Sequence, residues 1–406
     1  MALDFLEGLK VLDLGRDISA AFCARLFGDL GARVVKVEPP NGDPSRAMGP
    51  YPGDLPDRER SALFLGLNTN KLGVTLNLES AHGRDLLLQL ADEADLLVES
   101  YSPAYLPGIG LGYAQMHQRN PSMVVTSITP FGHSGPWAEY QANNLIVSNL
   151  SGHSRGHAGP VEDTAEEPPL QLAAHQADFV AGLAGATASM LALNRRRSTG
   201  EGCHVDVSAM EALALLPQTT LAEFDLGFPA RGRRKDQTVR QALVTLLPCR
   251  DGYVGISPRQ QDQWERFVEV MGNPQWVDDA KFATRDSRLA NWADLEPLLA
   301  AWTSGYSKEE VYRLAQDRRI PCFPLNTAAD LFTSTQFQAR EFLTEVEHPA
   351  AGALRYPGFP VRMGSGKRLG LAPAPLLGQH NHEVLGKEGL GLEPEELAAL
   401  RAQEII

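Results

Sequence analysis

The first 130 residues predict an α/β fold with a doubly wound parallel sheet, followed by a smaller second domain. Short runs of apolar and β-branched residues, typical of buried strands, alternate with segments whose apolar residues recur at helical spacing. A helix between successive strands is the pattern of parallel βαβ units. After about residue 225 the pattern changes to a hairpin signal and several amphipathic helices, which indicates a smaller α+β domain.

Strand segments of the larger domain are short and apolar. The first, 10–14, ends at Gly15, and the second, 33–38, is rich in valine. The remaining strands are expected at residues 73–78, 94–99, 123–129 and 203–207. Because helical segments separate them, we expect these strands to lie parallel in one sheet.

Helices are expected between the strands. Apolar residues at helical spacing predict a helix from Ser19 to Leu30, with Ser19 as a possible N-cap and Gly31 as a C-cap. A second helix is expected at 80–93, and a third, rich in small residues, at 178–196. Gly182, Gly185 and Ala188 lie on one side of this third helix, where they would let another backbone approach closely.

The smaller domain begins with a predicted hairpin. Asp251 and Gly252 form a strong turn signal between two apolar segments, 243–248 and 253–257. Amphipathic helices are then expected at 260–271, 293–302 and 308–318.

Composition narrows the function classes. The chain of 406 residues carries 37 basic and 50 acidic side chains, a net charge of −13, which argues against nucleic acid or an anionic membrane as the main partner. The longest apolar runs are too short to span a bilayer, and the first residues lack the features of a signal peptide. Four widely spaced cysteines favour reduced thiols, and we therefore expect a cytoplasmic enzyme.

Several motif-based functions find little support. Glu38 ends the second strand where a ribose-binding acid would sit, but the preceding turn has the single Gly15 instead of G-x-G-x-x-G. An NAD-binding oxidoreductase therefore remains only as an alternative. His153 and His157 have metal-like spacing but no completing carboxylate, and His380 and His382 suggest structural roles, so no metal is expected. No G-x-S-x-G nucleophile motif is present.

Asp178 is the residue that we expect to carry the chemistry. It stands at the start of the small-residue helix, where an aspartate is often simply the N-cap. The positive end of the helix dipole also favours an ionised carboxylate. Such a carboxylate can attack a carbonyl carbon without a separate base.

Taken in order, several blocks of this sequence resemble the family III CoA-transferases, the CaiB–BaiF family, along essentially the whole chain. The matching blocks are residues 8–14, 28–38, 42–46, 68–78, 94–103, 131–136, 197–208 and 377–385. The resemblance implies a large Rossmann-like domain made of residues 1–220 and 330–406, and a smaller α+β domain at 225–330. It also implies a homodimer of two interlocked chains.

The implied activity is transfer of CoA between carboxylic acids, with Asp178 as the catalytic residue. In this family scheme the aspartate attacks the donor acyl-CoA and forms a mixed anhydride. The released CoA thiolate then attacks the aspartyl carbonyl and forms an aspartyl-CoA thioester, which the acceptor acid resolves. Coenzyme A is thus a substrate, carried as acyl-CoA, and no permanently bound cofactor is expected. The expected partners are acyl-CoA and small carboxylic acids.

The resemblance also implies where CoA binds. The family's CoA-contact positions fall on Arg16, Ile18, Ser19, Pro39, Leu76, Ser100, Tyr101, Ile109 and Thr129. Leu76 and Tyr101 would flank the adenine, and Thr129 would lie near the pantetheine. Basic residues common in the family are missing after Glu38, at Glu79 and near Gly108. Lys36, Arg46 and Lys71 are the candidates to hold the 3′-phosphate in their place.

A second activity of the family, 2-methylacyl-CoA racemisation or CoA-ester isomerisation, remains an alternative. Racemases pair the aspartate with a histidine in a Gly-His-Asp stretch, whereas this chain has Ala142, Asn143 and Asn144 there. Asparagine does not shuttle protons near neutral pH, so the transferase is favoured. The sequence does not predict which donor and acceptor acids are used, although the loop 151–170 is expected to influence this specificity.

Overall fold

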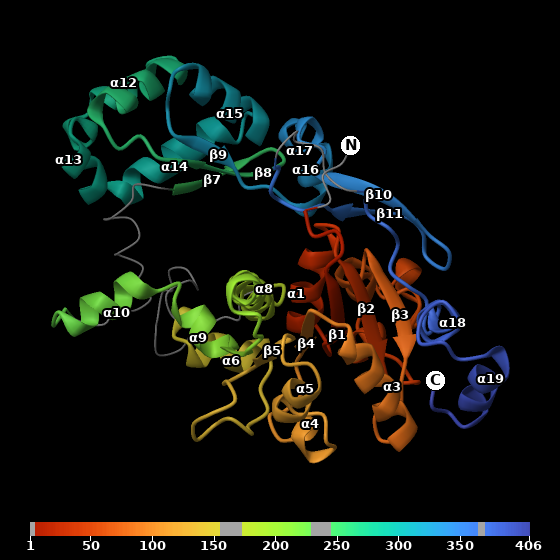
Figure 1. Cartoon of the computed structure of the whole chain (residues 1–406). Coiled ribbons are helices and arrows are strands. Elements are labelled where there is room, and N and C mark those ends of the chain that lie inside the picture. Colours follow the sequence, from red (N-terminus) through yellow and green to blue (C-terminus); the bar gives the residue numbers. More distant parts are fainter. Residues whose placement is uncertain (1–4, 155–172, 229–244, 364–369) are drawn as a thin grey trace. The chain divides into compact units, whose positions relative to one another are not determined.

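The computed structural model describes residues 5–154, 173–228, 245–363 and 370–406. These residues form two compact units (Figure 1). Within the described ranges, the larger unit contains residues up to 154, 173–228 and all those from 338 onward, and the smaller unit contains 245–337. The larger unit is therefore interrupted in sequence by the smaller one.

A six-stranded parallel sheet forms the centre of the larger unit, as the sequence predicts (Figure 1). The strand order is β3-β2-β1-β4-β5-β6, so the chain reverses its winding direction between β1 and β4. The strands are β1 Lys10–Leu14, β2 Arg33–Glu38, β3 Lys71–Thr75, β4 Leu96–Glu99, β5 Val124–Thr129 and β6 His204–Ser208. The third strand thus begins two residues earlier than the sequence predicts and ends at Thr75.

Both faces of the sheet are covered, because its residues alternate between two cores. Val11 and Val34 belong to the core that contains residues of α1 and α8, whereas their neighbours Leu12 and Val35 belong to the opposite core. That second core contains residues of α3, α5 and the C-terminal helices. These helices are α1 Ser19–Gly28, α8 Gln176–Thr199, α3 Ala81–Asp92, α5 Tyr113–Arg119, α18 Asn381–Leu385 and α19 Pro394–Ala402.

The C-terminal segment is tied to the sheet through β3. The Nδ1 atom of His380 accepts a hydrogen bond from the Gly73 amide at 2.9 Å, and Asn381 Oδ1 accepts one from the Thr75 amide at 2.9 Å. The structural role expected for His380 is therefore confirmed. Other short elements of the larger unit are α2 Ala62–Leu67, α4 Tyr105–Gly108, α6 Asn144–Leu150, α9 Ala209–Ala214, α10 Gln218–Asp225, β10 Leu343–His348 and β11 Gly352–Pro357.

The expected ends of α1 are wrong. Ile18, not Ser19, is the N-cap residue, and no side chain caps this end. The helix stops at Gly28, with Asp29 as the C-cap residue. Gly31 follows with a φ of 96° and lets the chain turn into β2.

Close packing of α8 depends on its glycines, as predicted. A Cβ atom at Gly182 would lie 2.5 Å from the carbonyl oxygen of Ser19, and one at Gly185 would lie 2.5 Å from Ile128 Cδ1. Ala188 is only half-buried. By length and composition alone α8 could cross a membrane, but a core helix passes the same test, and α8 packs on α1, β5 and α9.

The smaller unit has an antiparallel three-stranded sheet in the order β7-β8-β9. The predicted hairpin is present as β7 Thr245–Cys249 and β8 Gly252–Ile256, whereas the three-residue β9 Cys322–Pro324 was not expected. The predicted helices are present as α12 Gln261–Val270, α14 Trp292–Thr303 and α15 Lys308–Asp317. Two shorter helices, α13 Arg285–Ala290 and α16 Ala328–Thr333, also belong to it, and α17 Thr335–Ala339 leads back to the larger unit.

Candidate active site

The carboxyl ends of the parallel strands form one edge of the larger unit. The loop after β1 (residues 15–18), Pro39 after β2, Leu76 after β3 and Ser100 after β4 all lie at this edge. Ligands of open α/β sheets bind at this edge, beside the point where the strand order reverses. Residues distant in sequence are therefore brought together at the expected place.

A cleft with a volume of about 220 Å³ opens at this edge. Four of the residues predicted to contact CoA line it, and among the described lining residues Arg16 is the basic one. These four are Arg16, Pro39, Leu76 and Tyr101. The cleft is thus bounded by one basic side chain, by aromatic and apolar groups, and by Glu38 and Glu79. The cation and the stacked aromatic rings suit a nucleotide.

The aromatic wall of the cleft is built by Tyr101 and Tyr105. Their rings are stacked with centroids 4.7 Å apart, and the Arg16 guanidinium carbon lies 5.7 Å from the Tyr101 centroid. The Tyr105 hydroxyl donates to Glu79 at 2.6 Å. Ser100 ties this wall to the β1 loop, because its hydroxyl accepts from the Arg16 amide at 2.9 Å and donates to the Arg16 carbonyl at 3.0 Å.

The other predicted contact residues do not line this cleft. Ile18 is buried against Ala21 and Leu67, and Ile109 is half-buried on the second core. Thr129 is buried, and its hydroxyl accepts from the Gly132 amide at 2.9 Å. Ser19 begins α1 and presents its carbonyl oxygen to Gly182.

Lys36 and Lys71 are not available to hold a phosphate, so this part of the prediction is wrong. Both ammonium groups are fully buried. Lys36 Nζ donates to Asp43 at 2.8 Å and to the Gly15 carbonyl, and Lys71 Nζ donates to Asp13 at 2.7 Å. Removing one partner of a buried ion pair costs about 3–5 kcal/mol, so neither lysine will leave its carboxylate for a ligand.

Arg46 is likewise engaged. Its guanidinium forms two hydrogen bonds with Glu38, at 2.7 and 2.8 Å, and a third with Glu59 at 2.7 Å. The group also lies 3.7 Å from the centroid of Phe64. The guanidinium of Arg46 therefore stabilises the fold through Glu38 and Glu59 and is not free to bind a ligand.

The buried charges hold the loop that begins at Gly15. Asp13 accepts from the Gly15 amide at 2.8 Å, and Lys36 donates to the Gly15 carbonyl. Burial lowers the pKa of Lys71 to about 8, although Asp13 opposes that shift. Burial also acts against the charged form of Lys36, but Asp13, Asp43 and Glu38 outweigh it and the pKa of Lys36 is raised.

Asp178 lies in the first turn of α8 and is not its N-cap, contrary to the capping interpretation. His175 is the N-cap residue, with a left-handed φ of 55°. The Asp178 side chain is 29% exposed, so a substrate can reach it. Burial raises the pKa of Asp178, a contact with His175 opposes this, and the charge of Asp17 in the β1 loop raises it further.

His175 is a candidate functional residue that the sequence reasoning missed. Its Nδ1 atom lies 3.5 Å from Asp178 Oδ2. His175 stands three residues before Asp178, a spacing at which side chains meet in a helix. The backbone of His175 is left-handed and not helical, so this spacing does not predict the contact. The preceding Ala174 also has a positive φ, of 63°.

Glu99 is a second group that the sequence reasoning missed. Burial raises the pKa of this carboxyl to about 7, although hydrogen bonds from Ser127 and from the Tyr101 amide oppose the shift. The Tyr101 amide donates to Glu99 at 2.7 Å, and His133 Nε2 lies 3.7 Å from the same carboxyl group. Glu99 therefore supports the turn that carries the aromatic wall.

Asn143 and Asn144, at the position of the racemase histidine, act as helix caps. Asn143 accepts a hydrogen bond from the Ile146 amide at 3.2 Å and so caps α6. Asn144 accepts one from the Ala177 amide at 2.9 Å, at the start of α8. His157 and most of the loop 151–170 lie outside the described residues.

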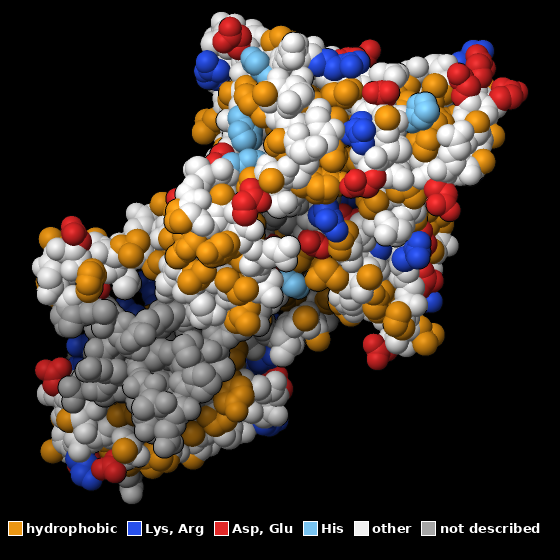
Figure 2. Space-filling model, turned by 90° about the horizontal axis from the view of Figure 1, so that it is seen from below, with side chains coloured by type: hydrophobic (Ala, Val, Ile, Leu, Met, Phe, Trp, Pro, Cys, Tyr) orange, Lys and Arg blue, Asp and Glu red, His pale blue; other side chains and the backbone are white. Residues whose placement is uncertain are grey.

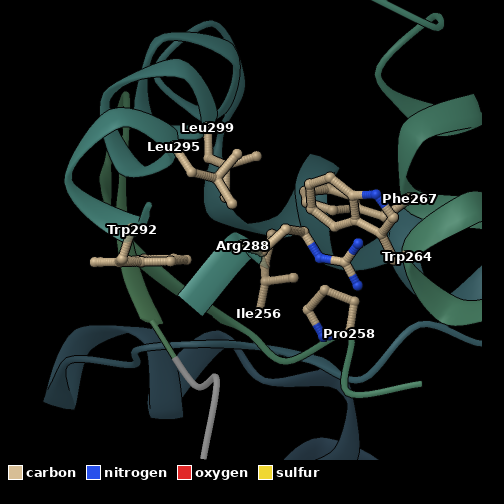
Figure 3. Close-up of a pocket in the computed structure, with 8 residues that line it drawn as sticks. All are labelled: Ile256, Pro258, Trp264, Phe267, Arg288, Trp292, Leu295 and Leu299. Atoms are coloured by element: carbon tan, nitrogen blue, oxygen red, sulfur yellow. The ribbon is translucent and has the colours of Figure 1, made fainter. Parts of the chain in front are cut away.

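The smaller unit contains a separate pocket around Arg288 (Figure 3). Its volume is only about 20 Å³, room for one water molecule. Figure 3 shows the Arg288 side chain among Ile256, Pro258 and Trp264, and its guanidinium carbon lies 4.4 Å from the Trp264 centroid. This pocket is too small for a substrate. Across the described ranges, no group of three or more His, Cys, Asp and Glu side chains could hold a metal ion.

Comparison with known proteins identifies relatives over the whole chain. The model of the family described as CoA-transferase family III matches residues 6–381. A succinyl-CoA–D-citramalate CoA-transferase from Chloroflexus aurantiacus is 28% identical over 405 residues, 99% of this chain and 98% of the relative. The subunit BbsE of a succinyl-CoA:(R)-benzylsuccinate CoA-transferase from Thauera aromatica is 34% identical over 400 residues, 95% of this chain and 94% of the relative.

Two further matches extend the comparison. A succinyl-CoA:glutarate CoA-transferase from Mus musculus is 30% identical over 404 residues, 99% of this chain and 90% of the relative. Among solved structures, a CaiB/BaiF family protein from Brucella suis superimposes with a TM-score of 0.82 at 26% identity, over 98% of both chains.

Proposed function

Because the chain belongs to CoA-transferase family III, we propose that it moves CoA from an acyl-CoA to a carboxylic acid through a covalent bond to Asp178. The observation that carries the residue assignment is the position of this carboxylate. It is partly exposed in the first turn of α8, where the ring of Phe179 contacts Phe22 of α1, with centroids 4.9 Å apart. Helix α1 follows the β1 loop, whose Arg16 lines the cleft, so this loop and α1 connect the cleft to the carboxylate.

We propose succinyl-CoA as the donor and a dicarboxylic acid as the acceptor. The three relatives described above are named for succinyl-CoA, and their named acceptors, D-citramalate, (R)-benzylsuccinate and glutarate, are all dicarboxylic acids.

In the first half of the proposed reaction, an Asp178 oxygen attacks the thioester carbon. A C–O bond forms, the C–S bond breaks, and its electron pair leaves with sulfur as CoA thiolate. The thiolate then attacks the aspartyl carbonyl, which releases the donor acid and leaves an aspartyl-CoA thioester. No proton is gained or lost in either exchange, so an ionised carboxylate is sufficient as the nucleophile.

In the second half, an oxygen of the acceptor carboxylate attacks the aspartyl carbonyl carbon. The C–S bond breaks, CoA leaves as thiolate, and a new anhydride remains. The thiolate then attacks the acceptor carbonyl, which releases acyl-CoA and regenerates the Asp178 carboxylate. The amino end of α8 favours the negative charge of the free carboxylate. Water has to be kept from these intermediates, because it would hydrolyse each of them.

We propose that the nucleotide part of CoA occupies the cleft at the carboxyl ends of β1 to β4. Tyr101 and Leu76 would contact the adenine, and Arg16 would pair with phosphate. Lys36, Arg46 and Lys71 contribute indirectly, by holding the β1 loop and the floor of the cleft.

We further propose a homodimer. Helices α6, α8 and α10 carry large exposed apolar side chains. They are Leu145, Ile146, Leu150, Leu183, Met190, Leu191, Leu221 and Phe224. Figure 2 shows groups of hydrophobic side chains on the face of the molecule seen from below. Monomeric proteins rarely leave a large apolar surface in water, and a second copy of the chain would cover it.

The covalent route is tested by trapping. After incubation with succinyl-CoA, hydroxylamine should convert Asp178 into a hydroxamate that mass spectrometry locates on the α8 peptide. Asp178→Asn should lower kcat by about 10³-fold or more, because the amide is not a nucleophile of comparable strength. Full activity of this variant would refute the proposal.

The same enzyme preparation tests the racemase alternative. A racemase exchanges the α-proton of a 2-methylacyl-CoA with solvent deuterium and needs no acceptor acid. We expect no such exchange, since Asn143 and Asn144 cap helices and offer no second base.

A further inference from the structure

We infer that His175 is a positioning residue for Asp178, which keeps the carboxylate ionised and oriented for attack. This inference rests on the proposed function, because it concerns the residue assigned there as the nucleophile. It adds a residue that neither the spacing nor the family motifs pointed to.

The contact between these two side chains is specific. His175 Nδ1 lies 3.5 Å from Asp178 Oδ2, and the two side chains are 42% and 29% exposed. Both side chains are thus partly accessible at the amino terminus of α8. A substrate thioester can reach the carboxylate while the imidazole remains beside it.

The backbone at His175 is bent in an unusual way to make this contact. Ala174 and His175 both have left-handed φ angles, of 63° and 55°. A non-glycine residue pays about 1–2 kcal/mol for this conformation, which the surrounding structure has to maintain. The amide of Phe179 donates to the His175 carbonyl at 3.1 Å, so the bend starts the helix, and the imidazole lies beside Asp178 in the first turn.

Within the described residues, two ionisable neighbours shift the pKa of the Asp178 carboxylate in opposite directions. Burial raises the pKa of Asp178, the imidazole of His175 lowers it, and the carboxylate of Asp17 raises it. A protonated imidazole favours the ionised aspartate, and only the ionised form attacks a thioester. Without His175, repulsion between the carboxylates of Asp17 and Asp178 would keep Asp178 protonated to higher pH.

The role of His175 is tested on the full-length enzyme by the pH profile of kcat/KM with succinyl-CoA. His175→Asn removes the imidazole beside Asp178, and asparagine tolerates left-handed backbone. The acidic limb of the profile should move to higher pH, so that activity falls most at mildly acidic pH and least at alkaline pH. His175→Lys keeps a positive charge and should return the limb toward that of the parent enzyme.

Two controls separate the possible outcomes. His82→Asn makes the same change at an exposed side chain on α3 and should leave the pH profile unchanged. An equal loss of activity at every pH in His175→Asn, or a profile that coincides with the parent, would overturn the inference. If Asp178→Asn retains full activity, the proposed function itself fails, whatever His175→Asn shows.

Discussion

Arg16 combines two contacts that are relevant to an anionic nucleotide. Its main chain is held by Ser100, and its guanidinium lies 5.7 Å from the face of Tyr101. The side chain is therefore placed by its neighbours while its charge still faces the cleft. Because Lys36 and Lys71 are committed to buried carboxylates, Arg16 is the residue that we expect to meet a CoA phosphate.

Arg16→Gln should raise the KM for acyl-CoA about tenfold and leave kcat nearly unchanged, because a hydrogen bond to a charged group contributes about 1.5–3 kcal/mol. Steady-state kinetics with varied succinyl-CoA measure this. The difference from the parent should shrink at high salt, which screens the charge. Arg33→Gln is the control, since Arg33 starts β2 at the opposite edge of the sheet. Equal effects of both variants would contradict the assignment.

For single residues, the sequence predicts where a side chain lies in the fold better than it predicts which side chain it contacts. Arg16, Pro39, Leu76 and Tyr101 follow parallel strands, so their common edge could be foreseen from the strand pattern. The partner of Lys71 is Asp13, 58 residues away, and no local pattern indicates this pair. The contact made by His175 depends on a left-handed backbone that the sequence does not reveal.

The β1 loop and α8 form the structural support of the site at the level of elements. The loop is held from below by Asp13 and Lys36, and α8 lies against α1, which follows the loop. Gly182 makes the close contact, since a Cβ there would meet the Ser19 carbonyl oxygen at 2.5 Å. The placement of Asp178 relative to the β1 loop therefore depends on glycine at position 182, which has no side chain.

Gly182→Ala should destabilise the protein by about 1–3 kcal/mol, because the new methyl group meets backbone that cannot move without repacking. The higher helix propensity of alanine, worth about 1 kcal/mol, acts against this loss. Urea unfolding followed by circular dichroism measures the free energy of unfolding.

Gly66→Ala is the matched control for this change. Gly66 lies within α2, and a Cβ there would meet nothing within 4 Å. This substitution should therefore stabilise the protein by about 0.5–1 kcal/mol. The same sign for both variants would show that helix propensity outweighs the contact at Gly182.

Elements with a strong pattern could be predicted, and short or capped ones could not. The six strands of the parallel sheet, α8 and the β7–β8 hairpin all follow from apolar periodicity and turn residues. The three-residue β9 is too short to carry a period, and its pairing with β8 depends on distant contacts. The helix ends at Ser19 and Asp178 were misassigned because tertiary packing, not a local cap, sets them.

For the whole molecule, the net charge of −13 has to be reconciled with anionic substrates. Much of the basic charge near the site is neutralised inside the larger unit, in the pairs of Lys36, Lys71 and Arg46 with carboxylates. Positive charge at the cleft then comes from Arg16, and the amino end of α8 adds the positive end of a helix dipole beside Asp178. A few oriented groups are sufficient for this, while the chain as a whole keeps its net negative charge.

The apolar surface around α10 gives a further property of the whole molecule. None of the eight residues of α10 is buried, although Leu221 and Phe224 are large apolar side chains. Phe224 is 67% exposed, and Leu226 just beyond the helix is 75% exposed. In the proposed homodimer the second copy would cover this helix, and stable interfaces bury about 800 Å² on each side.

The double variant Leu221→Glu, Phe224→Glu should convert a dimer into a monomer, because each new carboxylate would have to be desolvated at the interface. Sedimentation equilibrium measures the mass of the parent and variant at several concentrations. Leu55→Glu makes the same change at a side chain that is 65% exposed elsewhere in the larger unit, and it should leave the dimer intact. Circular dichroism has to show that the double variant is folded. A parent chain that sediments as a monomer would refute the homodimer, whereas a variant that remains dimeric would place the interface away from α10.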